Sequence, residues 1–137
     1  MKMKFLIPIL AASFAFNVPA SGDEDTPMAK QMDIMNDAYK AMRRLDDLTK
    51  GPELAREAQD AMIKAVVEVP TLVQDMPDGP DKAKASAQYR MMMGKLISTL
   101  AELELAFLDS DKAKVDDIIG LLRESKKEGH DKFMEDD

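Results

Sequence analysis

The segment TPMAKQMDIMNDAYKAM, residues 26–42, decides the fold of this chain. Its largest apolar residues recur at spacings of four, three, four and three: Met28, Met32, Met35, Tyr39 and Met42. This spacing is typical of one face of an amphipathic helix that packs against other helices. Thr26 is a favoured N-cap residue and Pro27 a favoured first helical residue, so we predict that the helix begins at Pro27.

The rest of the chain repeats this helical pattern. We expect the first helix to end after Leu48 or Thr49, because Gly51-Pro52 follows. A turn with two prolines, at residues 76–80, divides the remainder. Three further helices are expected over about 53–69, 81–108 and from Lys112 onward. With no strand pattern and mostly short connections, the sequence predicts an all-α fold, an antiparallel up-down-up-down four-helix bundle.

Residues 1–20 have the pattern of a secretory signal peptide. A basic start with Lys2 and Lys4 precedes an apolar run and a small-residue exit, and cleavage is expected after Ala20 or after Gly22. A membrane anchor is the alternative, but the apolar run is shorter than the roughly 20 residues that span a bilayer. We therefore expect export to the periplasm, no membrane attachment after cleavage, and a single domain over residues 23–137.

The charge and the missing cysteines restrict partners and cofactors. Removing residues 1–20 takes away two lysines and no acid, which lowers the formal net charge from −7 to −9. Such a surface disfavours nucleic acid and suits a basic redox partner. The chain contains no cysteine, so disulfides, thiolate ligands and thioether-linked haem are excluded. We expect a monomer.

His130 is the only histidine, and it lies near the end of the fourth predicted helix. Imidazole is the commonest metal-binding side chain. Met32 lies five residues after Pro27, about 7.5 Å along the first helix. In the predicted topology the first and fourth helices are neighbours, and both residues lie at the same end. A thioether facing an imidazole forms an axial pair for low-spin haem and raises its reduction potential.

Two segments resemble the cytochrome b562 family: residues 32–37 (MDIMND) and residues 130–133 (HDKF). The resemblance implies an exported four-helix bundle with one non-covalent haem b between Met32 and His130. Gln88-Tyr89-Arg90, with Met93 four residues beyond Tyr89, resembles the third-helix segment that packs against the haem. The resemblance therefore implies Tyr89 and Met93 as pocket residues, and we expect Phe133 to cover the edge near the histidine.

The sequence also departs from this family. Gly129 precedes the histidine where a bulkier residue is common in the family, and glycine weakens a helix by up to ~1 kcal/mol. Lys126 lies one helical turn before His130, where an arginine is frequent in the family. Its ammonium group would either approach a haem edge or remain in solvent.

Several alternatives stay open. Met35 shares the face of Met32 and is the likeliest substitute as a ligand, while Met28 lies too near the helix start. Because thioethers also bind Cu(I), an exported copper-binding bundle is a second hypothesis. A bundle without cofactor that acts through protein contacts is a third. Core packing is expected for Met42, Met62 and Met93, and the Met91-Met92-Met93 triplet cannot all face inward.

No catalytic arrangement is evident in the sequence. One histidine without cysteine excludes a Cys-His dyad, and no Glu-x-x-His motif or phosphate-binding glycine loop is present. We therefore expect a non-enzymatic periplasmic electron-transfer protein. Met32 and His130 are the expected iron ligands, and Tyr89, Met93 and Phe133 the expected haem contacts.

Overall fold

The computed structural model describes residues 26–133, and their regular secondary structure is entirely helical, with no strand among them. The elements are α3 (Pro27–Arg43), the 3₁₀ turn η2 (Leu48–Lys50), α4 (Gly51–Val66), the short α5 (Thr71–Gln74), α6 (Pro80–Leu108) and α7 (Lys112–Phe133). The predicted all-helical class is confirmed. The expected signal peptide, its cleavage site and residues 134–137 lie outside the described part of the chain.

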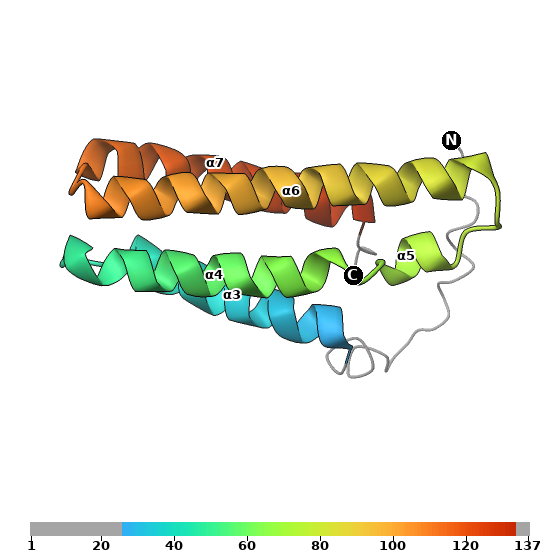
Figure 1. Ribbon diagram of the computed structural model, residues 1–137, viewed down its shortest axis with the longest axis horizontal. Coiled ribbons are helices and arrows are strands. Elements are labelled where there is room, and N and C mark those ends of the chain that lie inside the picture. The colour runs from blue at the N-terminus through green and yellow to red at the C-terminus, as the bar shows by residue number, and fades with distance from the viewer. Residues whose placement is uncertain (1–25, 134–137) are drawn as a thin grey trace.

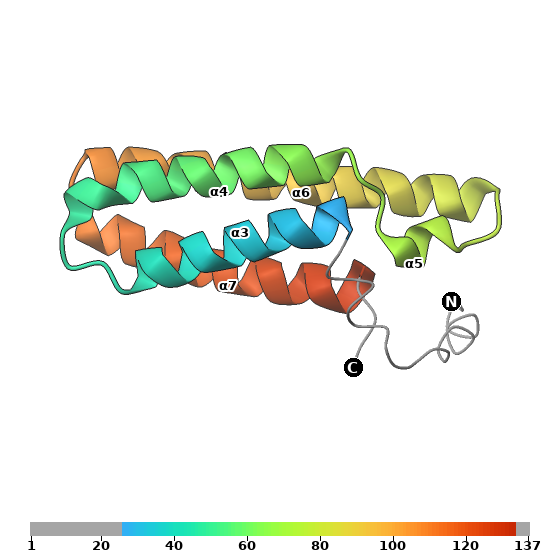
Figure 2. The same cartoon turned by 90° about the horizontal axis from the view of Figure 1, so that it is seen from below.

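The four long helices pack as a bundle. Figure 1 shows α3 and α4 in one layer and α6 and α7 in the other. In the rotated view of Figure 2, α4 lies in one layer with α6, and α3 lies in the other layer with α7. The start of α6 extends past the bundle, where it packs against α5. Within residues 26–133, no helix combines the length and apolar character that a bilayer span needs.

The start of α3 has the predicted cap. The Thr26 hydroxyl accepts a hydrogen bond of 3.0 Å from the backbone N–H of Ala29, and Pro27 is the first helical residue. Met28, Met35, Tyr39 and Met42 are buried, as the stripe predicted, and Met32 is half-buried.

The predicted end of the first helix is wrong. α3 ends at Arg43, and Gly51-Pro52 begins α4 instead of terminating α3. In the segment between the two helices, the Asp47 carboxylate caps the 3₁₀ turn η2, accepting hydrogen bonds from the Thr49 N–H at 3.0 Å and from the Thr49 hydroxyl at 2.7 Å. These bonds also hold the pKa of Asp47 below its usual value.

Gly51 has a packing role that its sequence context did not reveal. It is buried at the first turn of α4, and a Cβ atom there would overlap the ring of Phe107 on α6. The glycine therefore permits α4 and α6 to approach closely. This role cannot be predicted without knowing that Phe107 packs against position 51.

The second predicted helix is also too long. α4 ends at Val66, three residues before Val69, and the single turn α5 follows Pro70. A proline disfavours helical backbone in the residue before it, which explains why the helix stops early. The third prediction is accurate, since α6 covers Pro80–Leu108 and Gly79 precedes it with φ of 149°.

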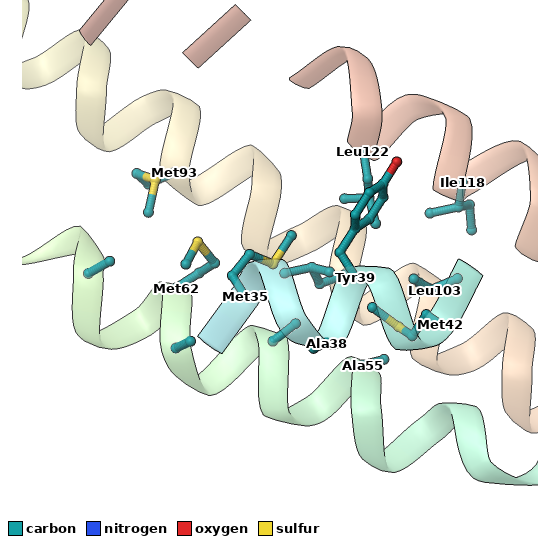
Figure 3. Close-up of a cluster of buried hydrophobic side chains, with 14 of the residues drawn as sticks. Met35, Ala38, Tyr39, Met42, Ala55, Met62, Met93, Leu103, Ile118 and Leu122 are labelled. Carbon is teal, nitrogen blue, oxygen red and sulfur yellow. The ribbon is translucent and has the colours of Figure 1, made fainter. Parts of the chain in front are cut away.

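Buried apolar side chains fill the bundle toward the α6–α7 turn. Leu103 and Leu122 are fully buried, and Figure 3 shows them with Met42, Ala55 and Ile118, so that all four long helices contribute. Burying each large apolar side chain contributes roughly 1.5–3 kcal/mol. We call this region the packed end; at the other end of the bundle the interior is not completely filled.

Candidate functional site

A cavity of about 240 Å³ lies where α3 begins and α7 ends. It is bordered by the first three turns of α3, the end of α4, the middle of α6 and the end of α7. Its lining residues are Met28, Met32, Asp33, Met35, Asn36, Met62, Pro70, Tyr89, Met92, Met93, Leu96, Ser125, Lys126, Gly129, His130 and Phe133. We call this region the cavity end.

The backbones of α3 and α7 hardly meet. Close backbone contacts join α3 to α4, α4 to α6, and α6 to α7, whereas α3 and α7 are connected mainly through side chains. The Lys126 ammonium donates a hydrogen bond to the side-chain oxygen of Asn36 on α3. The same ammonium lies 5.4 Å from the centroid of the Tyr39 ring. Residues of both helices line the cavity, which lies where their backbones are apart.

Met32 and His130, the two predicted iron ligands, line this cavity from different helices. Met32 is half-buried on α3, and His130 is exposed on the last turn of α7. Met28 and Met35, the alternatives on the same helix, line the cavity too. The helical stripe therefore directs three thioethers into the same space.

Tyr89 is one of the best-fixed side chains of the site. Its hydroxyl donates to the backbone carbonyl of Ala65 at 2.9 Å and contacts the Met28 sulfur at 3.4 Å. Burial, with the negative charge of Glu68, raises the pKa of Tyr89 to about 12. Its ring meets Phe133 edge-on, with centroids 5.5 Å apart and an interplanar angle of 74°. Tyr89 therefore ties α4 and α6 to the end of α7.

The methionine triplet on α6 divides as expected. Met93 is buried and lines the cavity, Met91 is exposed, and Met92 is half-buried. The core assignments of Met42, Met62 and Met93 are confirmed, although the last two also border the cavity. Met92 is a cavity residue that the sequence did not single out. The only available signal was its place in the triplet, and the helix rotation decides which neighbour faces inward.

The structure also explains the glycine at position 129. A Cβ atom at this position would lie 3.1 Å from the terminal methyl of Met92 and 3.8 Å from its sulfur. The glycine therefore leaves room for Met92 beside the residue that carries the imidazole. A bulkier residue would push the Met92 side chain away.

The family comparison agrees with this geometry. The family model for cytochrome b562 matches residues 28–134, which is most of the chain. The chain belongs to the cytochrome b562 family. Members of this family are periplasmic electron carriers that bind haem. Searches among curated proteins and among solved structures give no match.

The cavity has the donors that a b-type cytochrome needs, but in this structure it is narrow. Thioether sulfur and imidazole nitrogen are an established axial pair for haem iron, and they face this space from α3 and α7. Typical ligand pockets measure roughly 300–1,000 Å³, so a cavity of about 240 Å³ must widen to hold a macrocycle. Methionine side chains are flexible and make up much of the lining, so this widening requires rotamer changes more than backbone strain.

Among residues 26–133, no three His, Cys, Asp or Glu side chains gather as a site for a metal ion.

Two buried polar atoms within residues 26–133, the Tyr39 hydroxyl oxygen and the Gln31 amide oxygen, have no hydrogen-bond partner. Both belong to α3, the helix whose backbone hardly contacts α7.

Proposed function

We propose that this protein is a one-electron carrier of the periplasm that binds one non-covalent haem b between α3 and α7. Met32 and His130 are the proposed axial ligands, held in an antiparallel up-down-up-down four-helix bundle. The observation that carries this proposal is that these two residues line one cavity from two helices whose backbones hardly touch. When bound, the haem supplies reversible one-electron oxidation and reduction at its iron.

The protein residues around the cavity have separate tasks. His130 is exposed on the last turn of α7, Met32 is half-buried on α3, and both line the cavity. Tyr89, Met93 and Phe133 are the proposed walls, each less than a tenth exposed. Such a wall would exclude water and provide a low-dielectric environment, while Met32 and His130 would hold the iron. No position is left for a substrate, which suits electron transfer better than catalysis.

One contact between α3 and α7, the hydrogen bond from Lys126 to Asn36, bears on how the cavity widens; we call it the tether. Both residues line the cavity, so the tether lies where the two helices would have to separate. The lysine is exposed, and its ammonium can reorient into solvent at small cost. Our proposal is that this contact opens on haem binding.

A visible spectrum of the protein expressed with haem tests the function. We expect an intense Soret band and sharp α and β bands after reduction, as a six-coordinate low-spin haem gives. A protein that stays colourless and takes up no added hemin would contradict the proposal.

Single substitutions identify the ligands. His130→Ala is expected to abolish the low-spin spectrum, and Met32→Leu to convert it to a high-spin one. Met35→Leu is the matched control, since it changes a cavity methionine one turn away on the same helix. If Met35→Leu rather than Met32→Leu gives the high-spin spectrum, Met35 is the ligand.

Export is tested separately. We propose that residues 1–20, or residues 1–22, are removed as a signal peptide and that the acidic mature protein acts as a monomer with a basic redox partner. The intact mass of the periplasmic protein reports the cleavage site. An uncleaved chain in the cytoplasm would contradict this part of the proposal and leave haem binding untouched.

A further inference from the structure

Methionine is concentrated at the cavity far beyond the needs of one axial ligand. Six of the nine methionines within residues 26–133 line it: Met28, Met32, Met35, Met62, Met92 and Met93. They come from three helices, and His130 adds an imidazole from the fourth. The other three, Met42, Met76 and Met91, lie elsewhere and provide natural controls.

These six residues differ in how firmly they are held. Met35, Met62 and Met93 are buried among core residues, and the Met28 sulfur contacts the Tyr89 hydroxyl at 3.4 Å. Met32 and Met92 are only half-buried. Methionine is unbranched and has three rotatable bonds, so these two sulfurs can adjust their positions most easily.

Met92 on α6 and His130 on α7 both line the cavity, and Met92 lies close to the residue that precedes His130. The Met92 sulfur is 3.8 Å from the position that a Cβ atom on Gly129 would occupy, and Gly129 is the residue next to His130. Met32 faces the same space from α3. Two half-buried thioethers and one exposed imidazole therefore border the same cavity.

The chemistry of these donors selects a soft ion. Thioether sulfur prefers Cu(I), whereas Zn²⁺, Ca²⁺ and Mg²⁺ favour imidazole, thiolate or oxygen ligands. Asp33 is the one carboxylate of the lining, and it is exposed. A monovalent ion also places less charge near the Lys126 ammonium than a divalent ion would.

We propose that, without haem, the cavity is a binding site for a soft monovalent metal ion, Cu(I), with Met32, Met92 and His130 as ligands. Because Met32 and His130 are also the proposed haem ligands, the two occupants exclude each other. The haem-free protein is then a thioether copper site that is lost when haem binds. Binding involves no change in the oxidation state of the metal.

The test uses silver(I), a soft monovalent ion that does not change oxidation state, on the full haem-free protein labelled with ¹³C at its methionine methyls. One silver ion per chain is expected to shift the methyl signals of Met32 and Met92 and to leave those of Met76 and Met91 in place. It should also raise the midpoint of thermal unfolding, because it binds the folded state. Zinc(II) at the same concentration should do neither.

Variants then assign the ligands. Met32→Leu and Met92→Leu are each expected to weaken silver binding by about tenfold or more, which is the size of effect typical around metal sites. Met42→Leu and Met91→Leu are matched controls that alter a core and a surface methionine and should leave silver affinity unchanged. Anaerobic Cu(I) competition against a chelator of known affinity should rank the variants in the same order.

Two outcomes overturn the metal site: no silver retained by the wild type, or a silver affinity in Met32→Leu and Met92→Leu that equals that of the wild type. Hemin that binds without displacing silver would overturn the inference that the two occupants share ligands. A protein that binds silver at Met32 and Met92 but takes up no hemin would overturn the proposed electron-transfer function and leave the metal site standing. The two proposals therefore fail in distinguishable ways.

Discussion

The two ends of the bundle differ in what lies against a glycine at the helix contact. At the packed end, Gly51 lies against the ring of Phe107, which is buried in the core. At the cavity end, Gly129 faces the tip of Met92, which can rotate away. A rigid partner fixes the distance between helices, whereas a flexible partner permits it to change. The packed end can therefore hold the fold while the cavity end adapts to what it binds.

Substitutions that remove side-chain volume should give the largest difference in the free energy of unfolding between the packed end and the cavity end. Leu103 is fully buried at the packed end, so Leu103→Ala is expected to lower the free energy of unfolding by about 2–5 kcal/mol. Met92→Ala enlarges an existing cavity and should cost under about 1 kcal/mol in the haem-free protein. Urea unfolding monitored by circular dichroism measures both. Equal losses would mean that the cavity end is as rigidly packed as the core.

Added volume tests the same contrast with glycine substitutions. Gly51→Ala is expected to destabilise the fold by about 1–3 kcal/mol, because its Cβ would overlap Phe107. Gly94→Ala on α6 is the control: its Cβ meets nothing within 4 Å, so helix propensity should stabilise the protein by about 0.5–1 kcal/mol.

Gly129→Ala should fall between these two values, because the 3.1 Å contact is with the movable methyl of Met92. Thermal unfolding of the three variants gives the order directly. If Gly129→Ala destabilises the protein as strongly as Gly51→Ala, the Met92 side chain is not free to move. That result would contradict the inference that the cavity end adapts to what it binds.

The sequence predicted the elements better than their junctions. The Thr26 cap, the α3 stripe and the extent of α6 depend on local residues, and all three were predicted. The start of α4 was not, because Gly51 reads as a helix terminator until Phe107 is known to pack against it. Met92 was missed for a similar reason, since only the rotation of α6 decides that it and Met93 both border the cavity while Met91 does not.

Tyr89 belongs to the cavity end, where it joins α4, α6 and the end of α7, and its ionisation provides a pH test. Its pKa is raised to about 12 from an ordinary value of 10.0, so the folded state holds the proton more tightly than the unfolded state. The resulting stabilisation is complete below pH 10.0 and is lost as the pH rises toward about 12. We expect the wild type to lose stability over this interval more steeply than Tyr89→Phe. Parallel curves for the two proteins would contradict the assignment.

Tyr89→Phe also has an effect at neutral pH. It removes the 2.9 Å hydrogen bond to the Ala65 carbonyl, which should cost about 1 kcal/mol in the free energy of unfolding. The ring contact with Phe133 can remain, so the cavity wall should keep its shape. Hemin affinity is therefore expected to change less than stability does.

The smallest expected effect concerns the tether between α3 and α7. Lys126 is exposed and bonds Asn36, so Lys126→Met should change the free energy of unfolding by under about 1 kcal/mol. If the contact must open for haem to enter, the same substitution should speed hemin association in stopped-flow measurements. Asn36→Ala removes the other partner, and a double-mutant cycle isolates the shared contribution to that rate. Unchanged association rates in both variants would show that the cavity end opens without releasing this contact.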